Sequence, residues 1–210
     1  MAMEKESGRE NFVKWFSELT NKDVAIAGGK GASLAEMYNH KFPIPPGFVI
    51  TAQAYEHFIE KTVLKENIHK ILSRLNIEQT SELQETSKKI RELIDGAVMP
   101  ADLKDDILEA YEILDVDKQA MRKAKAGALD ILRTSHEPPF VAVRSSATTE
   151  DLADASFAGQ QDTFLGVKGK DELIEKVKQC FSSLFTARAI YYRKKKGFDH
   201  EKARLAVVVQ

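Results

Sequence analysis

A short stretch near the middle of the chain combines residue types that bind polyphosphates. Arg144 ends PPFVAVR, whose apolar, partly β-branched run is bounded by Pro138 and Pro139 and is typical of a buried strand. A guanidinium at a strand end can bind phosphate oxygens through two parallel N–H bonds. Ser and Thr hydroxyls and a Gly-Gln-Gln-Asp-Thr turn follow, and both can donate to further oxygens. On the arginine and the first two serines alone, a solvated loop is the commoner interpretation.

A second candidate phosphate site is the sequence GGKG at 28–31. It departs from the P-loop pattern, because Gly31 follows Lys30 where Ser or Thr is required and Val24 stands where the first glycine belongs. A lysine on a glycine-rich turn before a helix nevertheless places an ammonium beside an anion that also faces helix N–H groups. An ordinary helix-start turn is an equal alternative on these residues alone.

The two segments are parts of a longer pattern of four blocks. These are GGKGASLAEM with the following PIPPGF, then RSSATTEDLADASFAGQQDT, FTARAIYYR and LAVVVQ, at 28–48, 144–163, 185–193 and 205–210. In this order they resemble the N-terminal nucleotide-binding domain of the phosphoenolpyruvate synthase and pyruvate phosphate dikinase family. The wording of the central block is closer to the synthase branch.

The resemblance implies an ATP-grasp-like lobe in which the positions of Lys30 and Arg144 contact phosphate and the glycine turn covers the triphosphate. We therefore expect the ATP phosphates to be bound by Lys30, Arg144, Gly159, Gln160, Gln161, Asp162 and Thr163. The resemblance also implies partners within the same full-length chain. The β-phosphoryl group would pass to a histidine of a separate phosphohistidine domain and then to pyruvate in a barrel domain, leaving AMP and phosphate.

The resemblance places the Mg²⁺-binding carboxylates on a second lobe, beyond Gln210, and no pair of acids here matches them. Glu150, Asp151 and Asp154 are better interpreted as acids in the first turn of a short helix. We expect no catalytic residue and no metal ligand in these 210 residues. Because phosphoryl transfer depends on a metal that bridges the phosphates, we also expect no ATPase or AMP-forming activity from them alone.

Three alternatives stay open on the sequence. Rifampin-type phosphotransferases share nearly the same loop with a different acceptor, and pyruvate phosphate dikinases form the other branch of the family. A non-catalytic nucleotide-binding module is the alternative from another class, and the retained Lys30, Arg144 and GQQDT turn weigh against it. His136 superficially matches the Thr-x-His sequence around a phosphorylated histidine, but Glu137 and two prolines follow it. We interpret it as a linker residue.

Composition argues against several partners. The 31 basic and 32 acidic residues give a net charge of −1, which provides no field for nucleic acid or an anionic membrane. No apolar run approaches the roughly 20 residues that span a bilayer.

The single cysteine, Cys180, cannot form an internal disulfide, which fits the cytoplasm. Its apolar neighbours predict a packed thiol. The basic residues Lys194 to Lys196 are interpreted as a solvated helix end.

Periodicity predicts an α+β fold, with a small sheet packed by helices. Strands are expected near 47–51, 140–144 and 205–209, and helices over 32–40, 52–61 and 171–193, the last as one helix or two. Between 63 and 134, Leu and Ile recur at three- and four-residue intervals among Glu and Lys, which predicts a helical subdomain of three or four amphipathic helices broken near 96–100. Residues 12–19 fit a strand or a helix equally.

The last residues, Leu205 to Gln210, form an apolar segment with no turn after it. Natural domains rarely finish in this way, and the resemblance implies several hundred further residues. We therefore expect residues 1–210 to be a partial ATP-binding domain, truncated before the second ATP-grasp lobe.

Overall fold

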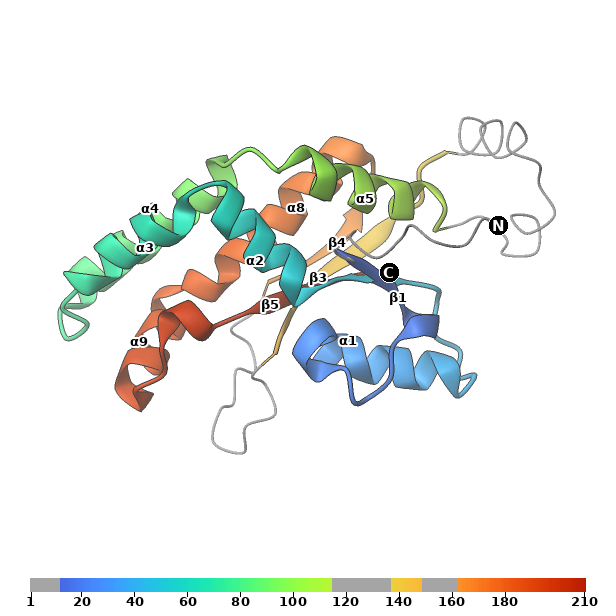
Figure 1. Ribbon diagram of the computed structural model, residues 1–210, viewed down its shortest axis with the longest axis horizontal. Helices are drawn as coiled ribbons and strands as arrows, with labels where there is room; N and C mark the ends of the chain where they lie inside the picture. Colours follow the sequence, from blue (N-terminus) through green and yellow to red (C-terminus); the bar gives the residue numbers. More distant parts are fainter. Residues whose placement is uncertain (1–11, 115–136, 149–161) are drawn as a thin grey trace, which may run out of the picture.

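The computed structural model describes residues 12–114, 137–148 and 162–210, and a five-stranded antiparallel sheet lies at their centre (Figure 1). The sheet order is β1-β2-β5-β3-β4. The strands are β1 Val13–Trp15, β2 Phe48–Ile50, β3 Val141–Ala147, β4 Thr163–Val167 and β5 Leu205–Val209. The α+β class and the three predicted strands are confirmed. Residues 12–19 resolve into β1 followed by a short 3-10 turn, and β4 was not predicted.

β5 is the central strand, and it joins two otherwise separate pairs of strands. Val208 is aligned with Val49 of β2 on one side and with Arg144 of β3 on the other. All five residues of β5 are buried. Because successive side chains of a strand point to opposite faces, an unbroken apolar run is what a strand covered on both faces requires.

One face of the sheet, here called the wide face, carries the larger core. Its helices are α2 Ala52–Lys61, α3 Leu64–Ser73, α4 Thr80–Gly96, α5 Ala101–Glu112, α8 Lys170–Ser182 and α9 Ala187–Lys196. Phe181 of α8 is fully buried, with its ring centroid 5.4 Å from those of Tyr55 and Phe58. The apolar side chains of α3, α4 and α5 belong to the same cluster as those of the sheet.

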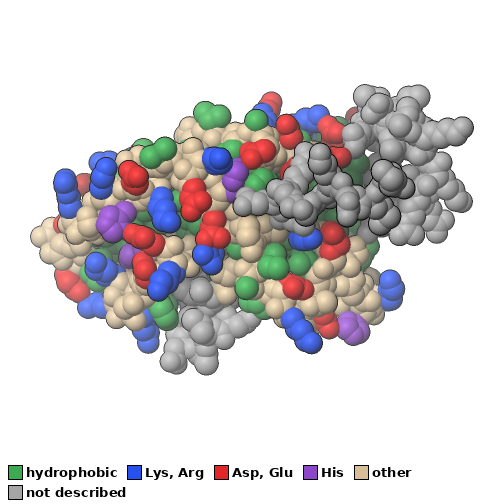
Figure 2. Space-filling model, viewed as in Figure 1, with side chains coloured by type: hydrophobic (Ala, Val, Ile, Leu, Met, Phe, Trp, Pro, Cys, Tyr) green, Lys and Arg blue, Asp and Glu red, His purple; other side chains and the backbone are tan. Residues whose placement is uncertain are grey.

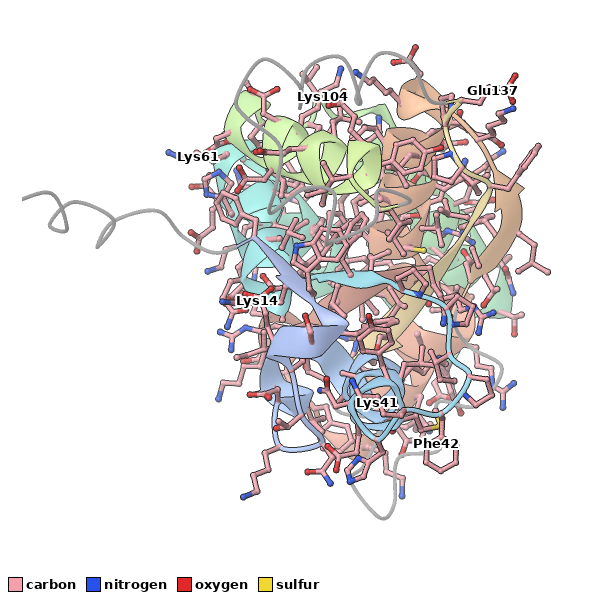
Figure 3. The ribbon with its side chains drawn as sticks, turned by 90° about the vertical axis from the view of Figure 1, so that its right-hand side faces the viewer. Lys14, Lys41, Phe42, Lys61, Lys104 and Glu137 are labelled. Atoms are coloured by element: carbon pink, nitrogen blue, oxygen red, sulfur yellow. The ribbon has the colours of Figure 1, made fainter. Side chains whose placement is uncertain are left out.

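The opposite face, here called the α1 face, is covered by α1 Val24–Asn39. Figure 3 shows α1 on one side of the sheet, with Lys41 and Phe42 just after its end, and α5 with Lys104 on the other side. In the cluster on the α1 face, the fully packed residues of the helix are alanines, among them Ala32, and they lie against Val49, Ala206 and Val208 of the sheet. A Cβ on Gly31 would lie 3.3 Å from Val49 Cγ2, so the helix lies close to the sheet.

The predicted helices that fall within the described ranges are found, with two differences, whereas residues 115–134 of the predicted helical block lie outside those ranges. α1 starts at Val24, earlier than the predicted 32–40, and contains a kink. The 171–193 segment divides into α8 and α9, which are joined by the 3-10 turn Ser183–Phe185. Thr186 caps α9 by accepting from Ala189 N at 3.2 Å. Cys180 is buried within α8, and burial raises the pKa of its thiol, which confirms the packed thiol.

The face of the molecule seen in Figure 2 is mixed in charge. Figure 2 shows Lys and Arg side chains interspersed with Asp and Glu over the visible described residues, without a large region of one sign. None of the helices in the described ranges is both long enough and apolar enough to cross a membrane. On this face no electrostatic field of one sign indicates a binding site, so the site has to be located from local contacts.

Candidate phosphate-binding site

The glycine-rich turn lies at the kink within α1. Gly28 has a φ of 67° and a ψ of 170°, a positive-φ conformation that glycine tolerates and other residues rarely adopt. A Cβ on Gly28 would lie 2.3 Å from both the carbonyl oxygen and the Oγ of Ser146. The absence of a side chain thus lets the turn lie directly against the end of β3, two residues after Arg144.

Two hydrogen bonds connect this turn to β3. The amide of Gly31 donates to Ser146 Oγ at 3.1 Å, in a buried position. Lys30 Nζ donates to the carbonyl oxygen of Ser145 at 3.2 Å, although the two residues are 115 positions apart in the sequence. The fold therefore brings Lys30 to β3, which carries Arg144 at its middle and not at its end as the sequence indicated.

Arg144 lies on the α1 face, since its neighbour across the sheet, Val208, belongs to the cluster packed against α1. Its side chain is half-buried, and Nε is buried with no hydrogen-bond partner among the described residues. An unsatisfied buried N–H of a guanidinium costs free energy until an acceptor reaches it. Among the described residues, this orphaned donor is the observation that most directly favours a bound anion.

Two residues of the predicted GQQDT turn are described, and they lie on opposite faces of the sheet. Thr163 is aligned with Arg144 across β3 and β4, so the two side chains share the α1 face. Asp162 precedes it, and its Oδ2 accepts from Nη2 of Arg91 in α4 at 3.0 Å. The structure thus places Thr163 beside Arg144 and gives the Asp162 carboxylate a different cationic partner. Gly159, Gln160 and Gln161 lie outside the described residues.

The two serines after Arg144 are used inside the protein, which the sequence analysis did not predict. Ser145 Oγ donates to the carbonyl oxygen of Asp162 at 3.2 Å, and Ser145 N donates to the same oxygen at 3.1 Å. Ser146 Oγ accepts from Gly31 N. Both serines are buried, so these hydroxyls connect β3 to β4 and to α1. The sequence signal for this role is that the two small polar residues directly continue an apolar strand.

The two remaining blocks of the sequence pattern build the fold. LAVVVQ contains β5, and FTARAIYYR contains the start of α9. Arg193 of α9 is buried and donates through Nη2 to the carbonyl oxygen of Leu184 and through Nε to Nδ1 of His200 at 3.0 Å. Burial lowers the pKa of Arg193 to about 10.

A cavity of about 460 Å³ lies between α2, α3 and the segment that follows α9. Its walls include Tyr55, Ile68, Leu72, Phe185, Phe198 and His200. Burial, together with the charges of Arg193 and Lys194, lowers the pKa of His200 to about 4. Lys30, Arg144, Asp162 and Thr163 do not line this cavity, which is therefore separate from the candidate phosphate site.

A nucleotide site of this kind also needs a metal ion, and the described residues contain no cluster of candidate ligands for one. No group of three or more His, Cys, Asp or Glu side chains in those residues could hold a metal ion. His136 and the acids Glu150, Asp151 and Asp154 lie outside the described ranges. The described residues around Arg144 thus offer cationic donors to phosphate oxygens.

Comparison with known proteins gives a consistent result. Residues 24–210 match the family model described as pyruvate phosphate dikinase, AMP/ATP-binding domain. A probable phosphoenolpyruvate synthase of Methanocaldococcus jannaschii is 52% identical over 199 residues, which are 95% of this chain and 15% of that protein. Phosphoenolpyruvate synthases of Helicobacter pylori and Pyrococcus furiosus are 47% and 41% identical, each over 95% of this chain and over 23% and 26% of their own length. The chain spans about a quarter or less of these relatives.

Proposed function

This chain belongs to the pyruvate phosphate dikinase AMP/ATP-binding domain family, and from this membership we propose that Arg144, Lys30 and the turn from Gly159 to Thr163 bind the phosphates of ATP. The observation that carries the proposal is the buried Nε of Arg144, which has no partner among the described residues. A phosphate oxygen is the acceptor best suited to a guanidinium, because the bond is charge-assisted and can be bidentate.

Three of the four described residues of the proposed site are assigned a contact with phosphate, and the carboxylate of the fourth, Asp162, faces Arg91 instead. Arg144 donates to phosphate from the α1 face of the sheet. Lys30 adds a second positive charge from the start of the helix after Gly28, and its bond to Ser145 O keeps it at β3. Thr163 adds a hydroxyl donor beside Arg144. Two cations offset part of the negative charge of the triphosphate, and Mg²⁺, whose ligands are proposed to lie elsewhere in the full-length protein, would supply further positive charge.

For the full-length protein we propose the activity of the named relatives, phosphoenolpyruvate synthase (pyruvate, water dikinase). ATP, pyruvate and water would give phosphoenolpyruvate, AMP and phosphate, with the β-phosphoryl group carried by a histidine of a phosphohistidine domain. The relatives are about four to seven times longer than their matched segments, since those segments are 26% to 15% of their length. The acceptor histidine, the metal ligands of a second ATP-grasp lobe and the pyruvate site are proposed to lie in that remainder.

The proposal is tested by titrating the full-length protein with ATP and Mg²⁺ in a calorimeter. Arg144→Ala and Lys30→Ala should each weaken binding by about 1.5–3 kcal/mol, roughly tenfold to a hundredfold, because each removes a charge-assisted contact. Arg74→Ala, at an exposed position after α3, is the control and should bind as the wild type does. Wild-type affinity in both test variants would remove the assignment. Release of AMP by the wild type distinguishes an enzyme from a non-catalytic binding module.

A further inference from the structure

The carboxylate of Asp162 connects the proposed phosphate site to a helix on the other side of the sheet. Its Oδ2 accepts from Arg91 Nη2 at 3.0 Å, and both side chains are about one-third exposed, at 34% for Arg91 and 32% for Asp162. Arg91 belongs to α4, on the wide face, and its Nε also donates to Ser182 Oγ of α8 at 3.5 Å. The ion pair therefore ties the start of β4 to two helices of the larger core.

The backbone of Asp162 is held at the same time by β3. Its carbonyl oxygen accepts from both the amide and the hydroxyl of Ser145, which is adjacent to Arg144. The next residue, Thr163, is aligned with Arg144 across the two strands. Asp162 is thus fixed on one side by a cation from the core and on the other by the strand that carries the phosphate-binding arginine. A displacement of Asp162 would move Thr163 relative to Arg144.

We propose that Arg91 is a positioning residue for ATP binding. It acts through Asp162 to hold Thr163 of β4 in register with Arg144 of β3. The inference rests on the proposed function, because it assigns Arg91 a role in the same phosphate site without contact to the nucleotide. It also accounts for an acid in the GQQDT turn. A bare carboxylate facing a triphosphate would repel it, whereas one that faces Arg91 from the opposite face of the sheet does not.

The test compares ATP with AMP in the full-length protein, because only ATP carries the β- and γ-phosphates. Arg91→Ala should weaken ATP binding about fivefold, as expected for a partly exposed ion pair, and leave the affinity for AMP unchanged. Arg91→Lys should bind ATP nearly as the wild type does, since one ammonium donor can replace the single Nη2 contact. Lys88→Ala removes another cation of α4, in an exposed pair with Glu92, and is the matched control with no expected change.

A double-variant cycle tests whether Arg91 acts through Asp162. Asp162→Asn should reproduce the loss of ATP affinity, and adding it to Arg91→Ala should cost little more, because the same interaction has already been removed. Additive losses would overturn the proposal. Equal weakening of ATP and AMP would also overturn it, since a general loss of folded protein lowers both affinities alike.

The outcomes separate this inference from the proposed function. Normal ATP affinity in Arg91→Ala, beside weakened binding in Arg144→Ala, would refute the positioning role and leave the phosphate site intact. Normal affinity in Arg144→Ala as well would refute the phosphate site itself.

Discussion

The two faces of the sheet are packed by different kinds of side chain. On the wide face, large side chains such as Phe58, Ile90 and Phe181 are fully buried between the sheet and several helices. On the α1 face, alanines and glycines of a single helix lie close to the backbone, and buried serines supply specific hydrogen bonds. The difference indicates that stability comes mainly from the wide face, since apolar area buried is far greater there, whereas the α1 face fixes the geometry of the phosphate site.

The largest expected effect is a loss of stability from a substitution in the core of the wide face, which should leave the geometry of the phosphate site unchanged. Phe181→Ala should destabilise the domain by about 3–5 kcal/mol, because it leaves a cavity beside Tyr55 and Phe58. Amide hydrogen exchange of α8 and β5 in the full-length protein measures the loss. The ATP affinity of the protein that stays folded should be unchanged, and Phe181→Leu should be much milder. A large change in affinity would show that the two faces are not separable.

The next substitution lies on the α1 face and should impair ATP binding as well as stability. Gly28→Ala should cost on the order of 3 kcal/mol, from the strained positive φ and from overlap with Ser146, and should also abolish tight ATP binding because α1 must move away from β3. Gly96→Ala is the control, since a Cβ there meets nothing within 4 Å. Thermal unfolding and ATP titration of both variants provide the measurement. An unperturbed site in Gly28→Ala would contradict the close approach described above.

The smallest expected effect is a pH dependence of stability. Burial lowers the pKa of His200 to about 4 from an ordinary value of 6.5, so between these pH values the imidazole stays neutral in the folded protein. As the pH falls below 6.5, the unfolded chain takes up a proton that the folded chain does not, so stability decreases towards pH 4. For a partly buried group we expect a loss on the order of 1 kcal/mol at pH 5. Urea unfolding of wild type and His200→Asn at pH 7 and pH 5 should show a smaller acid loss in the variant.

The parts of the fold that follow from local pattern were predictable from the sequence. β5 and the strand before Arg144 are apolar runs, and α2 was predicted with its observed bounds because its periodicity is clear. β4 was not predicted, because its five residues are mostly exposed and include Gly166 at positive φ, so neither alternation nor an apolar run marks them. Strand order depends on contacts far apart in sequence and has no local signature.

The candidate site was predictable in its residue types and unpredictable in its connections. Lys30 and Arg144 stand out by chemistry, and the fold brings their segments together. The sequence does not tell to which face of the sheet each residue of the turn points, because this depends on the register of β4 against β3. For the same reason the sequence could not distinguish Asp162, which pairs with Arg91, from Thr163, which lies beside Arg144. Binding of phosphate stays a prediction for all of the predicted residues, and Gly159, Gln160 and Gln161 also lie outside the described ranges.

The central place of β5 has a consequence for how the domain is made. During synthesis the β1–β2 and β3–β4 pairs leave the ribosome first, and neither pair contacts the other in the sheet order. Two-stranded units of this kind are marginal in water. The sheet can close only after residues 205–209 have emerged, so a nascent chain that stalls before them exposes the open edges of β2 and β3. For the described sheet, the interval before β5 is translated is therefore a period of aggregation risk.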